Sequence, residues 1–257
     1  MTSRQTARRS YGQHCAIARA LDLVGERWTL LILRELLLGS LRYTDLLDGL
    51  PGIGTNLLAR RLQDLEEAGI VERQVLPRPG GSMVYALTKQ GESLEPAIVA
   101  LGRFGGRLLP ERPGQEEFRP RWAVIGLRHT FRAENAPDEP RTYQLELNAE
   151  LFHVRVEDGR LITRQGPAGD PDLIVRTSAR ELLEILGGYR PVREAVASTA
   201  EVILADGRQG ARRSRAAEAR ALAEFVAMFG WGAARHAAPT RAGLPNSPAP
   251  TLISPPR

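Results

Sequence analysis

Cysteine and long apolar runs are what this chain of 257 residues most lacks. Its single cysteine, Cys15, excludes an intramolecular disulfide and is typical of a reducing compartment. No apolar run approaches the roughly 20 residues that a membrane-spanning helix needs. The first residues also lack the apolar core of a secretion signal. We therefore expect a soluble, cytoplasmic protein that does not contact membranes.

Groups that would support catalysis are also missing. The four histidines have no metal-ligand spacing with one another or with the cysteine, so we expect no metal site. No glycine-rich phosphate loop is present, and we expect no cofactor. His14 precedes Cys15, but adjacent side chains seldom face each other, and no third group is available to orient the pair. The sequence therefore predicts no catalytic residues and a protein that is not an enzyme.

Charge and length set broader limits. The formal net charge of +5 favours an acidic partner such as nucleic acid, although only weakly. Lys89 is the only lysine among 35 basic residues, and we attribute the excess of arginine to coding bias. The length and the hydrophobic content of 42% allow two domains, each with its own core.

The segment from Gly54 to Thr88 organises the N-terminal half. Leu58, Leu62 and Leu65 recur at helical spacing and share one face, while Asn56 and Arg60 point the other way. Residues 70–76 and 83–87 alternate as strands do, and a Pro/Gly-rich tip joins them. We predict a helix that ends at Gly69, followed by a β-hairpin.

An outward-facing asparagine and arginine suit the major groove of DNA. Asn can bond adenine and Arg can bond guanine, each through two hydrogen bonds. The alternative is a solvated helix beside a surface hairpin. The upstream residues favour DNA binding, because an apolar helix at 28–39 and a short helix at 45–49, capped by Thr44, complete a helix-turn-helix order.

Residues 25–73 and 84–94 resemble the HxlR-type winged helix-turn-helix transcriptional regulators, and the likeness is dense from Cys15 to Leu109. The resemblance implies a homodimer that pairs through the N-terminal helix and the helix after the wing. It also implies a recognition helix at 55–68. In the dimer, the two copies of this helix would enter successive major grooves of a palindromic operator in double-stranded DNA.

The resemblance transfers DNA contacts to matching positions only. It places three residues on the recognition helix, one on the wing tip and two at the entry to the preceding helix. A further arginine, Arg61, lies at the flank of the recognition helix, where pairing with a carboxylate such as Glu66 is the alternative. Base preference does not transfer, because Gly54 and Thr55 replace the Ser-Pro-like start common in relatives and Asn56 replaces a frequent lysine. The predicted contacts are Arg42, Thr44, Thr55, Asn56, Arg60, Arg61 and Arg78.

Cys15 precedes the first helix, where many relatives of this type have a cysteine and some use it to sense oxidants or electrophiles. A helix N-terminus stabilises a thiolate, which is the physical basis for such reactivity. The alternative is an inert thiol at the dimer interface. Leu94, Ile98 and Leu101 share one face of a helix predicted at 91–109, and we assign that face to dimerisation.

The C-terminal half changes in pattern. Alternating runs from residue 142 to 166 are divided at Asn148 and at Asp158, which predicts an antiparallel meander. A strand at 172–177, a capped helix at 178–188, a short helix at 192–198, a strand at 201–204 and a helix at 219–231 follow. This order resembles the sterol carrier protein-like (SCP2-like) fold, which implies an apolar pocket. The pocket candidates are Phe152, Val154, Leu183, Leu186, Phe225 and Phe229; the alternative is that they fill a solid core.

These observations together predict an α+β protein. We expect a winged-helix domain at 13–110, a linker with a helix at 111–139, an SCP2-like domain at 140–231 and a disordered tail at 232–257. We expect a dimeric repressor whose C-terminal domain senses a small apolar effector. The alternative is a lipid or acyl carrier that uses its N-terminal domain only for dimerisation.

Overall fold

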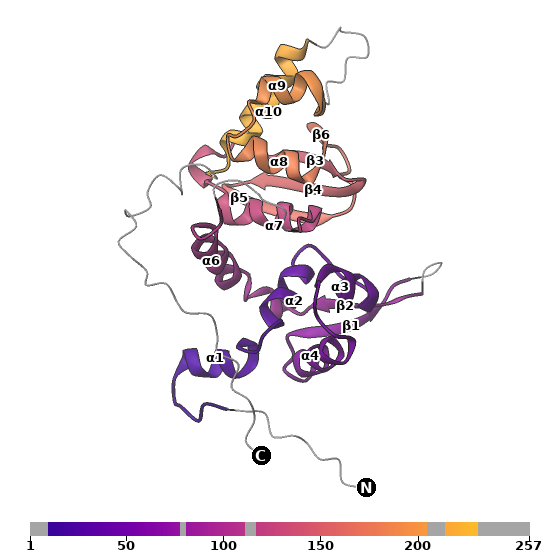
Figure 1. The fold of residues 1–257 in the computed structure, drawn as a ribbon, viewed down its shortest axis with the longest axis vertical. Coiled ribbons are helices and arrows are strands. Elements are labelled where there is room, and N and C mark those ends of the chain that lie inside the picture. The colour runs from indigo at the N-terminus through magenta and orange to yellow at the C-terminus, as the bar shows by residue number, and fades with distance from the viewer. Residues whose placement is uncertain (1–9, 78–80, 111–116, 205–213, 231–257) are drawn as a thin grey trace, which may run out of the picture.

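The computed structural model describes residues 10–77, 81–110, 117–204 and 214–230. Figure 1 shows the elements up to β2 gathered at one end of the molecule and the larger sheet with α8 to α10 at the other, with α6 between them. Across the residues that the structure describes, no helix has the length and apolar composition needed to span a membrane. The predicted tail at 232–257 lies outside the described residues.

The N-terminal half forms a winged helix-turn-helix. Its helix α4 is amphipathic as predicted, because Leu58, Leu62 and Leu65 are buried in one core cluster. Gly69 follows the helix with a φ of +67°, a conformation that glycine adopts without a Cβ clash. The elements are α1 (Ala16–Val24), α2 (Thr29–Leu36), α3 (Tyr43–Gly49), α4 (Thr55–Glu67), β1 (Val71–Val75), β2 (Met83–Leu87), α5 (Lys89–Glu92) and α6 (Glu95–Gly106).

Three details differ from the sequence-based predictions. Thr44 lies inside the first turn of α3 and does not cap it; instead the Asp45 carboxylate accepts a hydrogen bond from the backbone N–H of Arg42 at 3.2 Å. The helix predicted at 28–39 ends at Leu36. The helix predicted at 91–109 is divided into α5 and α6, and Pro96 occupies the first turn of α6, where a missing N–H costs nothing.

The C-terminal half contains a five-stranded sheet in the order β5-β4-β3-β6-β7. Strand β3 pairs parallel with β6, and the other pairs are antiparallel. Its elements are α7 (Pro120–Thr130), η1 (Ala133–Asn135), β3 (Arg141–Leu147), β4 (Glu150–Glu157), β5 (Arg160–Gln165), β6 (Leu173–Thr177), α8 (Ala179–Leu186), α9 (Val192–Ser198), β7 (Glu201–Leu204) and α10 (Arg215–Ala227).

The predicted meander of β3, β4 and β5 is confirmed, and its two tight turns explain the register. Asn148 and Ala149 have φ values of 50° and 69°, and Asp158 and Gly159 have 51° and 68°. Two consecutive left-handed residues define the turn whose twist matches that of the flanking strands. The alternation along β3 therefore places Tyr143 and every second residue after it in the core.

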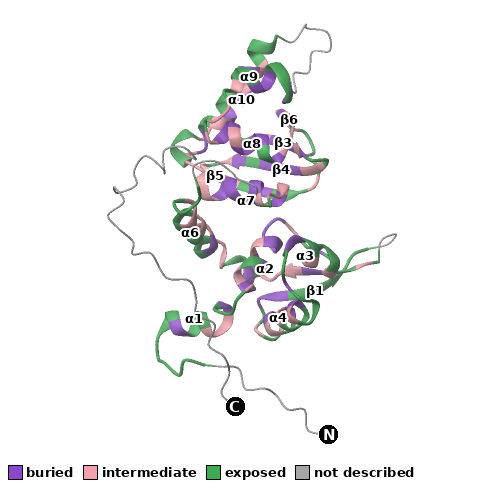
Figure 2. Ribbon diagram, in the orientation of Figure 1, coloured by how far each residue is buried: buried purple, intermediate pink, exposed green. Residues whose placement is uncertain are grey.

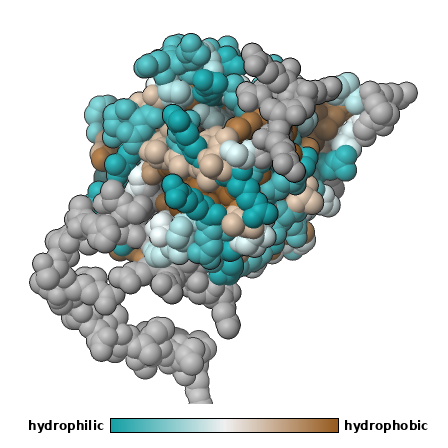
Figure 3. Space-filling view, turned by 90° about the horizontal axis from the view of Figure 1, so that it is seen from above, coloured by the Kyte–Doolittle hydropathy of each residue, from teal (hydrophilic) through white to brown (hydrophobic). Residues whose placement is uncertain are grey.

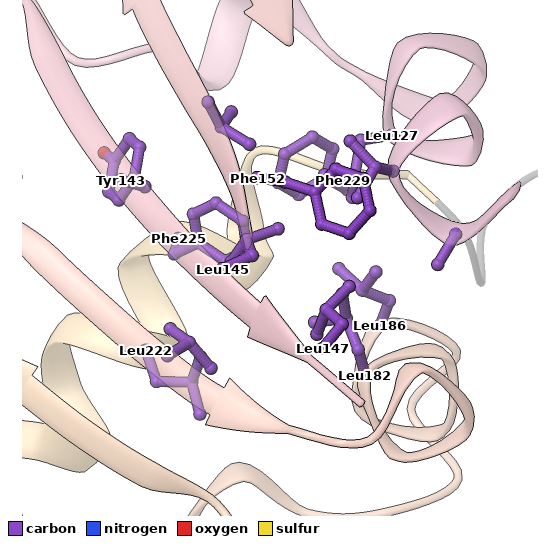
Figure 4. Packing of buried hydrophobic residues seen from close by; sticks show 14 of the residues in the cluster. Leu127, Tyr143, Leu145, Leu147, Phe152, Leu182, Leu186, Leu222, Phe225 and Phe229 are labelled. Atoms are coloured by element: carbon purple, nitrogen blue, oxygen red, sulfur yellow. The ribbon is translucent and has the colours of Figure 1, made fainter. Parts of the chain in front are cut away.

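Helix α7 belongs to the C-terminal core and is more than part of a linker. Its Ala123, Val124 and Leu127 are fully buried against strands of the sheet and against α8 and α10. Figure 4 shows Leu127 within the same cluster as Phe152 and Phe229. The proposed linker at 111–139 therefore contains an element that is necessary for the second core, and only part of the segment joins the two halves.

The two halves meet at a buried carboxylate. Glu35 of α2 is 0% exposed, and its Oε1 accepts hydrogen bonds from Arg34 at 2.6 Å and from the indole N–H of Trp122 at 2.8 Å. Its Oε2 lies 3.3 Å from Nε of Arg121. On the other side Gly49 of α3 lies so close that an added Cβ would be 3.1 Å from the carboxylate. Glu35 therefore contacts both the helix-turn-helix and α7.

A second arginine of α7 strengthens this junction. Arg128 donates hydrogen bonds to the Leu37 carbonyl at 3.1 Å, to the Thr163 carbonyl and hydroxyl at 2.7 Å, and to Glu95 at 2.6 Å. The backbone N–H of Gln165 in β5 donates to the Leu38 carbonyl at 2.9 Å. Carbonyls just after α2, which have no partner inside that helix, are thus satisfied by the C-terminal half.

We predict that Glu35→Ala lowers the free energy of unfolding by about 3–5 kcal/mol, because it leaves the buried Arg121 guanidinium without its carboxylate. Urea denaturation followed by circular dichroism measures this loss. The matched control is Glu157→Ala, which removes a carboxylate from an exposed pair with Arg155 and should leave the midpoint nearly unchanged. A similar small effect in both variants would contradict the proposed importance of the junction.

Helix α6 and helix α7 meet at His129. Its ring lies against Gly102, where any Cβ would collide with the imidazole. Burial, followed by the charges of Arg103, Arg128 and Arg34, lowers the pKa of His129 from 6.5 to about 4. The imidazole is therefore neutral at pH 7, and α6 is held close to α7 by an uncharged ring.

We predict that the free energy of unfolding falls as the pH drops from about 6.5 to about 4. In that window the unfolded chain takes up a proton at His129 that the folded chain does not, and the loss should be about 1–3 kcal/mol. Denaturation at pH 7 and pH 5 measures it. His129→Gln should show a shallower dependence on pH than the unsubstituted protein, and equal slopes would show that His129 is not the group responsible.

Candidate DNA-binding surface

The exposed face of α4 presents the predicted base-reading residues. Thr55, Asn56 and Arg60 are all exposed, and Gly54 begins the helix as its N-cap. Within the described part of the chain, no residue is hydrogen-bonded or ion-paired with the side chains of Asn56 and Arg60. Figure 2 shows this exposed face of α4 opposite its buried face. Two polar side chains are therefore held outward by the leucines behind them.

Tyr43 determines where α4 begins, and sequence reasoning missed it. Its hydroxyl donates a hydrogen bond to the carbonyl of Thr55 at 2.7 Å. This bond joins the first residue of α3 to the first residue of α4 across the turn that contains Gly52, whose φ is +89°. No sequence motif marks this contact, because its two partners are 12 positions apart and lie on different helices.

Arg61 is engaged within the protein. Its guanidinium pairs with Glu26 at 2.7 Å and with Asp64 at 3.0 Å. Glu66, which we named as its alternative partner, instead pairs with Arg73 at 2.6 Å. The expectation of a carboxylate partner was sound, but the partner was wrong, since Glu26 lies 35 positions away and is brought near only by the fold.

The remaining predicted contacts are distributed around α4. Arg42 and Thr44 are exposed at the start of α3. Arg78 lies outside the described residues. On β1 the guanidinium of Arg73 lies over the ring of Tyr85, and its hydrogen bond with Glu66 raises its pKa, so this residue is a fixed positive charge beside the wing.

Two helices expose apolar side chains beside this surface. Ile17 and Leu21 are exposed on α1, and Leu101, Phe104 and Leu108 are exposed on or just after α6. Figure 2 shows α1 projecting from the rest of the molecule with most of its surface exposed. Of the face that we assigned to dimerisation, Ile98 is buried in the winged-helix core and Leu94 packs against that core, so only Leu101 is exposed.

Cys15 and the six pocket candidates lie in contrasting environments. Cys15 is exposed at the N-cap of α1.

The six pocket candidates are all buried, and five of them belong to the core cluster of the C-terminal half. None of the six lines the cavity under α10 or the one beside α2 and β2. The structure therefore places Phe152, Val154, Leu183, Leu186, Phe225 and Phe229 in packed surroundings.

The order α2, α3, turn, α4 and a two-stranded wing defines a winged helix-turn-helix protein of the DNA-binding type. Residues 23–113 match the HxlR-like helix-turn-helix family. A transcriptional regulator of this type from Synechocystis is 38% identical over 100 residues, which cover 39% of this chain and 74% of the relative. The chain therefore belongs to the HxlR-like family of transcriptional regulators.

Other relatives agree with this assignment. A regulator from Mycobacterium tuberculosis is 40% identical over 126 residues, covering 49% of this chain and 73% of the relative. The regulator YodB from Bacillus subtilis is 41% identical over 76 residues, covering 30% and 68%. The solved structure of reduced YodB shares 31% identity, covers 39% of this chain and all of that chain, and has a TM-score of 0.34. The family match ends at residue 113, so the C-terminal sheet lies beyond it.

Proposed function

We propose that this protein is a homodimeric, sequence-specific DNA-binding regulator, acting as a repressor, which inserts α4 into the major groove. The observation that supports this most strongly is the exposure of Asn56 and Arg60 above three buried leucines. Both side chains can read base edges through paired hydrogen bonds. Arg42, Thr44 and Thr55 are exposed nearby and suit phosphate contacts, which position the helix without reading sequence. We give Arg78 the same role.

Arg61 has a different role in this proposal. Its ion pair with Glu26 links α4 to the segment between α1 and α2, and its second ion pair, with Asp64, lies within α4. We therefore assign it to holding the recognition helix in place, because both terminal nitrogens of its guanidinium are paired and its Nε is buried.

Dimerisation is supported by the apolar side chains that α1 and α6 expose. Phe104 is 64% exposed and Ile17 is 72% exposed, and a monomer would leave both in water. Burying such side chains against a second copy is favourable by about 25 cal/mol per Å². Two copies of α4 would then read a palindromic operator, because the symmetry of the dimer matches that of the site.

The C-terminal half has the strand and helix order that we associate with an SCP2-like domain, and we propose that it binds a small effector. Its rigid junction with α2 supports regulation, since an effector that prefers one arrangement of the two halves would change DNA affinity, typically by about 1–3 kcal/mol. The alternative, a lipid carrier that ignores DNA, leaves the outward Asn56 and Arg60 without a use and is not favoured.

We predict that the protein shifts DNA from its own upstream region in a saturable, sequence-selective manner. Asn56→Ala and Arg60→Ala should each weaken binding by about 1–3 kcal/mol, which is roughly 5-fold to 150-fold, because each removes a paired contact with a base. Gel-shift titrations over a series of salt concentrations measure this.

The charge-matched control is Arg155→Ala, which removes an exposed arginine from the C-terminal sheet. It should bind the same DNA as tightly as the unsubstituted protein. If Arg60→Ala and Arg155→Ala bind with equal affinity, α4 does not read the operator.

We predict that Phe104→Asp converts the dimer into a monomer, because it places a charge within an apolar interface. Sedimentation velocity measures the change in mass. Ile162→Asp makes the same exchange at an exposed position on β5 and should remain dimeric. A dimer in both variants would place the interface elsewhere.

Cys15 remains a proposed oxidant sensor, supported by its exposure at the start of α1. The single cysteine would react by sulfenylation or by a bond to a second thiol. In the gel shift, peroxide should change DNA binding of the unsubstituted protein and not of Cys15→Ser; an equal response in both would remove this proposal.

A further inference from the structure

A cavity of about 670 Å³ lies at the end of the C-terminal sheet under α10. Its floor comes from β3, β6 and β7, its roof from α10, and one side from the segment at η1. A volume of this size suits a small molecule. Seen from the end of the molecule that carries α9 and α10, hydrophobic side chains lie among hydrophilic ones (Figure 3).

One polar group in the cavity has no hydrogen-bond partner among the described residues. Tyr143 is 8% exposed, and its ring packs against Phe225 with centroids 4.9 Å apart. Figure 4 shows its hydroxyl directed away from this aromatic cluster. Among the described residues none is hydrogen-bonded to that hydroxyl, although Tyr143 lines the cavity. The hydroxyl is not sealed off from solvent, so a molecule that enters the cavity can form a hydrogen bond with it.

The other polar groups of the cavity are already occupied. Asp172 accepts hydrogen bonds from Arg141 at 3.1 Å and from the backbone N–H of Thr142 at 2.7 Å. The side-chain amide of Asn135 donates to the Ala227 carbonyl at 2.7 Å. Glu224 pairs with Arg220 at 3.0 Å. A charged ligand would therefore meet no unpaired opposite charge among the described lining residues.

Tyr143 can donate a hydrogen bond at neutral pH. Burial raises the pKa of Tyr143 to about 12. The charge of Arg141 lowers this pKa, and the carboxylates of Asp172 and Glu224 raise it. The hydroxyl therefore keeps its proton. The apolar part of the lining, Leu173, Leu204 and Met228, lies beside it.

We propose that this cavity binds an uncharged amphipathic molecule, whose carbonyl oxygen accepts a hydrogen bond from Tyr143 and whose apolar chain lies against Leu173, Leu204 and Met228. This deepens the effector-binding part of the proposed function and rests on it. The cavity differs in place from the six core residues that the sequence suggested. The Tyr143 hydroxyl also favours ligands that carry a carbonyl oxygen, which a wholly apolar pocket would not favour.

The cavity is connected to the junction between the two halves. Asn135 follows α7, and α7 carries Arg121 and Arg128. The residue after α7, Phe131, forms a β-bridge with Phe229, just beyond α10. A ligand between α10 and the segment at η1 would therefore lie close to this bridge, which joins the end of α7 to the end of α10.

The test is isothermal titration calorimetry of the full chain with octanamide, octanoate and octylamine, which share a chain length and differ in charge. Octanamide should bind, and the two charged compounds should bind at least about tenfold more weakly. Tyr143→Phe should weaken octanamide binding about threefold to tenfold, the size of one lost hydrogen bond. Tyr11→Phe, which changes an exposed tyrosine outside the cavity, should have no effect. Ala221→Met, which fills the cavity from α10, should abolish binding.

Three results would overturn the inference: no binding of octanamide, tighter binding of a charged compound, or equal binding by Tyr143→Phe and the unsubstituted protein. The same preparations are tested for the DNA shift. A normal shift without octanamide binding removes this inference alone, whereas octanamide binding without a sequence-selective shift removes DNA regulation and leaves the cavity assignment standing.

Discussion

A buried carboxylate is the constraint on which the arrangement of the two halves depends. Glu35 would be costly to desolvate alone, and it is tolerated because Arg34, Arg121 and Trp122 surround it. These partners come from both α2 and α7. Gly49 of α3 packs on the same carboxylate, so the helix-turn-helix and α7 both contact Glu35. The two halves consequently contact each other through fixed hydrogen bonds as well as through the chain that joins them.

This arrangement gives regulation a physical route. Helix α4 lies at one end of the molecule and α10, whose residues line the cavity, lies at the other (Figure 1). Between them lie α2, α6 and α7, joined by Arg128 and by the close packing of His129 on Gly102. Such contacts have discrete geometries. An effector that favoured one geometry would therefore change the position of α4 relative to the C-terminal half.

Local patterns predicted the elements well, and they predicted the partners of individual side chains poorly. The leucine spacing of α4, the glycine after it and the two tight turns of the meander depend on neighbours within a few residues, and the structure confirms them. The partner of Arg61 and the role of Tyr43 depend on residues far along the chain, and no local pattern contains that information. The pocket candidates show the same limit, because apolar alternation indicates burial without distinguishing a packed core from the wall of a cavity.

The sequence by itself determined the winged-helix order, the outward face of α4 and the two tight turns of the meander, because side-chain periodicity and turn chemistry act over short distances. Only the tertiary structure decided that α7 belongs to the second core, that Glu35 joins the two halves, and that Tyr143 faces a cavity. The reason is physical: burial and hydrogen-bond satisfaction are properties of groups that meet in space, and their free energies depend on neighbours that the chain brings together only when it folds.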